Sequence, residues 1–136
     1  MKLHVDIVSA EGEIFSGPAA MVFAPAVQGE VGIAPRHAPL LTRLNPGPVR
    51  IRDESGADET IFVNGGFLEV LPHHVTVMAD SAERAADLDE SRAIEAKRRA
   101  EEALSNANAD IDLARAQAEL AEAAARLHLI KKLKRR

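Results

Sequence analysis

The side chains that could perform chemistry are few and scattered. The chain has five histidines, six serines and no cysteine. His73 and His74 are adjacent, but neighbouring residues of a strand point to opposite faces and no cluster of Asp or Glu accompanies them, so we interpret the pair as a solvated turn. No serine stands in a nucleophile-elbow setting, and no histidine lies at a recognisable triad spacing from one. The sequence therefore predicts no catalytic residue and no metal site.

The charges are unevenly distributed. The net charge is −4, yet residues 1–130 hold 12 basic and 21 acidic side chains, and the last six residues carry five positive charges. Such a basic end complements the dipole at a helix C-terminus and can also contact an acidic surface. An acidic body without Tyr or Trp argues against nucleic-acid binding. No apolar run approaches the roughly 20 residues of a membrane-spanning helix, so we expect no transmembrane segment.

The elements that position these groups are of two kinds. All 8 Gly, 7 Pro and 4 Phe lie at or before Pro72, and the last 64 residues contain none of them. The C-terminal part is instead rich in Ala, Glu, Arg and Leu, which favour helices. We therefore predict an α+β protein: an antiparallel β-sandwich or flattened barrel over residues 1–84, followed by a helical hairpin over residues 85–136. The absence of cysteine fits a reducing compartment.

Short alternating segments predict the strands. Leu3, Val5 and Ile7 alternate with polar residues, and further apolar runs occupy 20–24, 49–51, 60–63, 67–71 and 75–78. Asp53–Gly56 predicts a hairpin turn, and Gly65–Gly66 predicts a break or bulge. No segment of helix length separates these strands, so we expect no parallel crossover. The segment from Gly29 to Thr42, with two prolines, is expected to be a shaped loop in which Leu40 and Leu41 can be buried.

Two helices are expected at about 87–104 and 110–132. Asp87 with Glu90 resembles a capping box, and 105–108 are good turn formers. Small residues recur on the first helix at Ala93, Ala96, Ala100 and Ala103, and a seam of period 3.5 runs along the second through Leu113, Ala116, Leu120, Ala123, Leu127 and Ile130. A hairpin with so small an apolar seam is weakly stabilised, so we interpret it as a candidate conformational switch.

Four motifs in order carry a family resemblance: G-E-V-G-I-A-P-R-H-A-P-L-L-T from Gly29, N-G-G-F-L-E-V at 64–70, V-T-V-M-A-D at 75–80 and D-L-D-E-S-R-A at 87–93. Followed by an alanine-rich helical pair, they resemble the epsilon subunit of the bacterial ATP synthase, the proton-driven rotary enzyme. The resemblance implies a non-catalytic subunit of the central stalk at the cytoplasmic face of the bacterial inner membrane. Its sandwich would couple the gamma subunit to the ring of c subunits. Its hairpin would inhibit ATP hydrolysis by extending toward the alpha and beta subunits.

The resemblance also implies site residues. The c-ring and gamma contacts would fall on Glu30, Val31, Gly32, His37 and Leu41. Val31 stands where leucine is commoner in the family. Arg36 stands where glycine is usual, and glycine can supply a positive φ. The basic end would contact the alpha and beta subunits through Lys131, Lys132, Lys134, Arg135 and Arg136.

A regulatory ATP site is implied by the Leu-Asp-x-x-Arg-Ala pattern. It would comprise Glu83, Leu88, Asp89, Arg92, Ala93, Arg99 and Arg126. An ordinary helix start explains the same residue types, and a second cation that the family places near Glu122–Ala123 is missing. We therefore expect no cofactor and weak ATP binding at best.

Two other classes of protein share this layout. A helical-hairpin adaptor or chaperone would purify with varied clients. A stand-alone ATP sensor would bind ATP tightly and change shape without any rotor. Affinity purification from membranes distinguishes them, because a rotor subunit would recover the alpha, beta and gamma subunits in fixed ratio.

Overall fold

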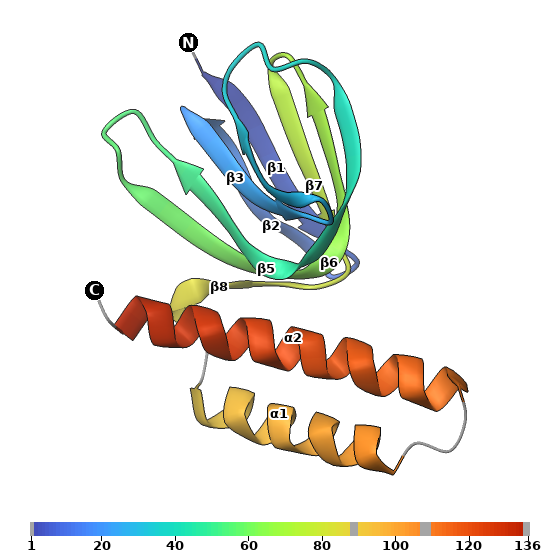
Figure 1. Cartoon of the computed structure of the whole chain (residues 1–136). Coiled ribbons are helices and arrows are strands. Elements are labelled where there is room, and N and C mark those ends of the chain that lie inside the picture. The colour runs from blue at the N-terminus through green and yellow to red at the C-terminus, as the bar shows by residue number, and fades with distance from the viewer. Residues whose placement is uncertain (1, 88–89, 107–109, 135–136) are drawn as a thin grey trace. The chain divides into compact units, whose positions relative to one another are not determined.

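The computed structural model describes residues 2–87, 90–106 and 110–134. The chain divides into two compact units, Met1–Ala85 and Ala86–Arg136. The first unit holds the strands and the second holds the two α-helices (Figure 1). The predicted β-sandwich followed by two helices is confirmed.

The described part of the first unit contains eight strands. They are β1 (Leu3–Ser9), β2 (Gly12–Ala19), β3 (Met21–Ala26), β4 (Gly29–Ile33), β5 (Leu40–Arg52), β6 (Asp58–Leu71), β7 (His74–Ala79) and β8 (Ala82–Arg84). Strands β5 and β6 are long, and the Asp53–Gly56 turn between them was expected from the sequence. The Asp53 carboxylate closes this turn by accepting from the Ser55 and Ala57 amides at 2.9 and 3.1 Å.

The strands form one folded sheet in the order β2-β1-β7-β6-β5-β3-β4, with β8 paired to the first half of β6. Strands β2 and β4 end this order, so the sheet is not closed into a barrel. All described pairs are antiparallel except one, because β1 runs parallel to β7 with His4 opposite His74. The expectation of a purely antiparallel sheet is thus wrong at this pair, whose long connection is the rest of the sandwich and not a helix.

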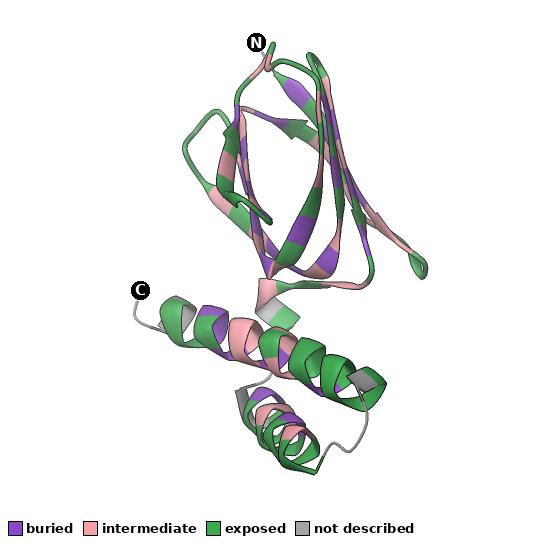
Figure 2. Cartoon of the chain, turned by 45° about the vertical axis from the view of Figure 1, so that its right-hand side comes forward, coloured by how far each residue is buried: buried purple, intermediate pink, exposed green. Residues whose placement is uncertain are grey.

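The core of the sandwich comes from the buried alternate residues of the strands. Val5, Ile7, Val22, Ile33 and Val49 are among the residues with no exposed surface. Figure 2 shows buried and exposed positions alternating along the strands, the pattern of strands with one face in a core. Burying these side chains contributes about 1.5–3 kcal/mol each. Together they form one hydrophobic cluster within the first unit, so this unit has a core of its own.

The segment from Gly29 to Thr42 differs from the predicted loop. Gly29–Ile33 forms β4, and β5 already begins at Leu40. Leu40 packs against the core, whereas Leu41 is 68% exposed, so its expected burial is wrong. The reason is alternation: adjacent residues of a strand face opposite sides, so a paired Leu-Leu cannot be buried on one side.

A 3-10 turn, Ala85–Asp87, spans the boundary between the two units and precedes α1 (Glu90–Ser105) and α2 (Asp110–Lys134). Helix α1 therefore begins later than the expected position 87, and Asp87 belongs to the turn. Within the described residues, no helix combines the length and the apolarity that crossing a bilayer requires.

The two helices are antiparallel. Ala93, near the start of α1, packs with Leu127 and Ile130, near the end of α2. The expected seam is buried at Ala93, Ala100, Ala116, Ala123, Leu127 and Ile130. The seam positions nearest the connection between the helices are not buried, since Ala103 and Leu113 are exposed.

Candidate functional site

The outer side of β5, β6 and β7 carries exposed large apolar side chains. Phe67, Leu71 and Met78 are 48%, 45% and 40% exposed, and Leu41 is 68% exposed. Phe67 lies opposite Met78 on β7. Leu41 on β5 lies opposite Glu69, and Leu71 follows two residues after Glu69 on β6, on the same side of the sheet. We call Leu41, Phe67, Leu71 and Met78 the apolar face. Isolated exposed apolar residues are ordinary, but four on neighbouring positions of one sheet indicate an interaction surface.

Three residues of the apolar face were not singled out from the sequence. A signal for them exists: Phe67, Leu71 and Met78 are large apolar residues at positions of their strands where alternation calls for polar ones. The neighbouring positions Leu68, Val70 and Val77 are fully buried. Leu41, by contrast, belongs to the predicted partner contact.

The predicted contact residue His37 lies in the turn beside this face. Its backbone N–H donates to the Ala34 carbonyl at 3.2 Å, and its Nδ1 lies 2.7 Å from the Ala38 carbonyl. Arg36 precedes it with φ of 67°, and the Arg36 N–H donates to the Pro72 carbonyl at 2.7 Å. Because Pro72 follows Leu71, this hydrogen bond ties the turn to the edge of the apolar face.

The other predicted contact residues, Glu30, Val31 and Gly32, lie on β4, which ends the strand order. Glu30 is anchored, since Arg50 Nη2 donates to Glu30 Oε1 at 3.1 Å while the guanidinium stacks on Phe23 at 4.3 Å. A Cβ on Gly32 would stand 3.4 Å from the same Phe23 ring, so Gly32 lies beside this ring at ordinary contact distance. Val31 packs against the core. The predicted contact residues therefore divide between β4 and the region of His37 and Leu41.

A polar cluster that the sequence did not predict joins β1, β2 and β7. Asp6 accepts from Ser16 Oγ at 2.6 Å and lies 3.1 Å from His4 Nε2 and 2.8 Å from His74 Nε2. The Ser16 hydrogen bond, with those of the two histidines, lowers the pKa of Asp6. Ser16 and Asp6 both face the same His4 nitrogen, so no proton relay of the serine-hydrolase type exists here. The cluster cross-links three strands.

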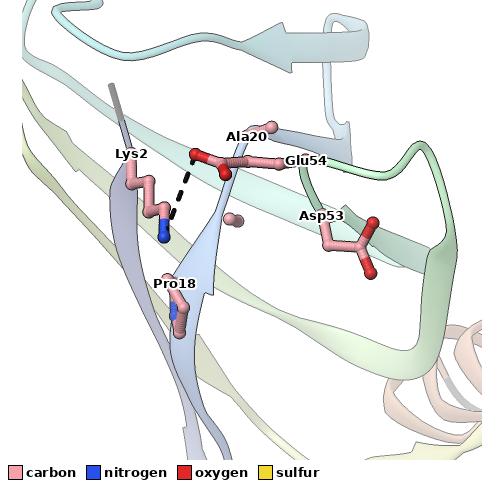
Figure 3. Close-up of a pocket in the computed structure, with 6 residues that line it drawn as sticks. Lys2, Pro18, Ala20, Asp53 and Glu54 are labelled. Atoms are coloured by element: carbon pink, nitrogen blue, oxygen red, sulfur yellow. Dashed lines mark ion pairs between the residues drawn. The ribbon is translucent and has the colours of Figure 1, made fainter.

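Metal binding finds no support in the described residues, since no group of three or more His, Cys, Asp and Glu is arranged to hold an ion. A pocket of about 250 Å³ lies between the start of β1, the end of β2 and the β5–β6 turn. Figure 3 shows the residues that line it. Its polar lining is a Lys2–Glu54 ion pair at 3.9 Å and Asp53. Asp53 is engaged in its own turn, where the hydrogen bond donated by the Ser55 hydroxyl lowers the pKa of its carboxyl group. The pocket brings together no nucleophile and base.

The residues of the implied ATP site are dispersed over three elements. Glu83 lies on β8, while Leu88 and Asp89 lie outside the described residues. Arg92, Ala93 and Arg99 lie on α1, and Arg126 lies on α2. Ala93 is buried in the helix seam. Arg99 lies 4.0 Å from Glu95 and Arg126 lies 3.3 Å from Glu122, so both cations already have an anionic neighbour on their own helix.

The basic end is described only in part. Lys131 and Lys132 are exposed in the last turn of α2. Lys134 is the last residue of that helix, and Arg135 and Arg136 lie outside the described residues.

Comparison with known families matches both units. Residues 2–85 match the model of the ATP synthase delta/epsilon chain β-sandwich domain, and residues 86–131 match that of the ATP synthase delta/epsilon chain long α-helix domain. The chain is 62% identical over 136 residues to the ATP synthase epsilon chain of Thioalkalivibrio sulfidiphilus, covering 99% of this chain and 96% of the relative. It is 57% identical over 133 residues to that of Nitrosomonas eutropha, covering 98% and 95%.

Solved structures share the fold at low identity. A chain of the Euglena gracilis mitochondrial ATP synthase, in a structure of OSCP, F1 and the c-ring, matches with a TM-score of 0.81 at 17% identity. That match covers 99% of this chain and 82% of the other. A chain of the Tetrahymena thermophila central stalk and c-ring matches with a TM-score of 0.66 at 14% identity over 98% of this chain and 96% of the other. From the family models and the close bacterial relatives, the chain belongs to the ATP synthase epsilon chain family.

Proposed function

We propose that this protein is a non-catalytic subunit of the central stalk of a bacterial ATP synthase, peripheral to the cytoplasmic face of the inner membrane. It transmits torque between the membrane-embedded c ring and the catalytic head. The observation that carries the proposal is the apolar face, an exposed surface suited to a permanent partner, on a chain of the epsilon family. The described residues offer surfaces for contact with other proteins. These are the apolar face, the end strand β4 and the exposed lysines of α2.

The sandwich supplies the rotor contacts in this proposal. The gamma subunit binds the apolar face together with His37, because Phe67, Leu71 and Met78 extend the surface on which Leu41 lies. The c ring contacts Glu30, Val31 and Gly32 on β4. This second assignment is supported by the position of β4 at the end of the strand order and by the Arg50 ion pair, which orients the Glu30 carboxylate.

The helical hairpin acts as the brake on ATP hydrolysis. Its seam is made largely of alanines, with Leu127 and Ile130 as the large buried residues that pack with Ala93. Alanine burial contributes much less than leucine burial, so little free energy opposes a rearrangement of the two helices. Lys131 and the following basic residues then provide a charged contact for acidic surface on the alpha and beta subunits.

Deletion of residues 86–136 tests the assignment. The sandwich keeps its own core, so the truncated protein should assemble into the complex and sustain ATP synthesis. ATP hydrolysis by the membranes should rise, because the brake is absent. Assembly is measured by co-purification of the alpha, beta and gamma subunits. If the truncated protein no longer assembled, the hairpin would be an assembly element and its assignment as a brake would be wrong.

A further inference from the structure

The arginines of the sandwich fall into two groups. Arg50 and Arg52 pair with Asp58, and Arg84 pairs with Glu59. Arg36 and Arg43 are both exposed, and neither forms an ion pair in the part of the chain that the structure describes. Residues 1–85 contain eleven Asp and Glu against six Lys and Arg. Two guanidinium groups of this unit therefore have no ion-pair partner among the described residues, although the unit holds more carboxylates than cations.

Both free arginines border the apolar face. Arg43 lies on β5 directly opposite Phe67. Arg36 is attached to the other end of the face, because its N–H donates to the carbonyl of Pro72, the residue after Leu71. Glu69 is the carboxylate within the face, opposite Leu41, and no ion pair joins it to either arginine. The free cations are therefore placed where a partner covering Phe67 and Leu71 would meet them.

The backbone at Arg36 is unfavourable for an arginine. It is the one described non-glycine residue with positive φ, at 67°, a conformation in which an L side chain crowds the following carbonyl. Such outliers persist where the surrounding structure holds them, and they gather at functional sites. The 2.7 Å hydrogen bond to Pro72 holds the residue in place, so its guanidinium is presented from a fixed backbone.

We propose that Arg36 and Arg43 determine partner specificity by binding carboxylates that surround an apolar patch on the central-stalk partner. This rests on the proposed function of the apolar face. Interfaces combine a desolvated apolar centre with a polar rim, and Arg is enriched in them because its planar group pairs with carboxylates in two-point geometry. The remainder of residues 1–85 holds eleven acidic against four basic side chains, so its net charge disfavours the binding of an acid-rimmed partner elsewhere.

The test is binding of full-length variants to the ATP synthase catalytic core of the same organism, prepared without this subunit. Arg36→Asn removes the charge but tolerates positive φ, and Arg43→Gln removes the second charge. Each should weaken binding about three- to tenfold at about 50 mM NaCl, and the difference should shrink at about 500 mM NaCl because salt screens rim charges. Lys97→Gln on α1 is the charge-matched control and should bind like the parent protein.

Phe67→Asp reports separately on the proposed face. If Phe67→Asp binds the core as tightly as the parent, the apolar face is not the contact, and both the proposed face and this inference fail. If Phe67→Asp binds weakly while Arg36→Asn and Arg43→Gln bind normally at low salt, the face stands and only the role of the two arginines is overturned. Equal weakening by Lys97→Gln would show that net charge alone is responsible, which also overturns it. Thermal unfolding of each variant verifies that the fold is retained.

Discussion

Gly66 shows how closely two strands of the sandwich approach each other. Its φ is +125°, and a Cβ built there would stand 2.1 Å from the Met78 carbonyl oxygen and 2.9 Å from the Ala79 Cα. Neither backbone atom can move without disrupting the β6–β7 pair. Glycine is therefore required twice at this position, for the backbone conformation and for the space.

Gly66→Ala should destabilise the protein by about 3–4 kcal/mol, because strain and a backbone clash combine. Gly56→Ala is the matched control, since Gly56 also has positive φ, +90°, but has open space around it. Its cost should be about 1 kcal/mol from backbone strain alone. Urea unfolding followed by circular dichroism measures both. Equal costs would show that the clash at Gly66 is relieved by a shift of β7.

Asp58 joins two of the three arginines of β5, Arg50 and Arg52. Arg52 donates to both of its carboxylate oxygens, at 2.8 and 3.3 Å, and Arg50 Nη1 lies 3.5 Å from Oδ2. The Arg52 hydrogen bond is the largest cause that lowers the pKa of Asp58 below 3.8. A depressed carboxyl pKa contributes stability above the unfolded-state pKa, and this stability is lost as the pH falls through the folded-state pKa.

Asp58→Asn should accordingly cost about 1–2 kcal/mol at pH 7, and the difference from the parent should decline below about pH 4. Denaturant unfolding at a series of pH values measures it. Glu69→Gln, at an exposed carboxylate without an ion pair, should change stability little at any pH. A cost for Asp58→Asn that stayed constant down to pH 2 would contradict the ionic origin of this contribution.

Some residue contacts were beyond sequence reasoning because their partners are distant in the chain. His74 and Asp6 are 68 positions apart and meet only because β1 and β7 pair in one register. The adjacent histidines predicted a solvated turn, which holds for His73 but not for His74, a residue of β7. The positive φ at Arg36, in contrast, could be anticipated, because the family resemblance places glycine at that position.

Among the elements, those with clear periodicity were predicted and those rich in glycine and proline were not. The alternation at Leu3–Ile7 and the turn at Asp53–Gly56 identify strands β1, β5 and β6 directly. Strand β4 was missed because Gly29 and Gly32 resemble loop residues; an end strand with one paired side tolerates them. The parallel β1–β7 pair leaves no local signal, because both strands have the same alternation that an antiparallel pair would have.

The helical hairpin depends on few large side chains. Leu127 is 7% exposed and packs with Ala93 and Ile130, whereas Leu113 of the same predicted seam is 39% exposed. Leu127→Ala should weaken the hairpin by about 2–3 kcal/mol, and Leu113→Ala should cost less than about 1 kcal/mol. Amide hydrogen exchange of α1 and α2 measures the effect within the unit. Similar exchange in both variants would show that the seam is not the main stabilising contact.

At the scale of the whole molecule, charge and packing separate the two units. Residues 1–85 carry a net charge of −5, from six basic and eleven acidic residues, and hold the larger hydrophobic core. The basic end of the chain belongs to the helical unit. The division could be derived from composition, because glycine and proline end at Pro72 while helix formers follow. The surface that contacts the partners could not be derived from composition, because the apolar face forms only when three strands are paired.

The charges of the helical unit determine how ATP can bind to it. A tight ATP site needs free cations that converge on the phosphates, but Arg99 and Arg126 lie beside Glu95 and Glu122, at 4.0 and 3.3 Å. ATP must compete with these carboxylates and bring its negatively charged triphosphate close to them, which costs affinity. Isothermal titration of the full-length protein should therefore show a dissociation constant of about 1 mM or weaker. Glu122→Gln removes one competing charge and should tighten binding several-fold. A submillimolar constant for the parent protein, unaffected by Glu122→Gln, would mean that ATP is held by other residues than these arginines.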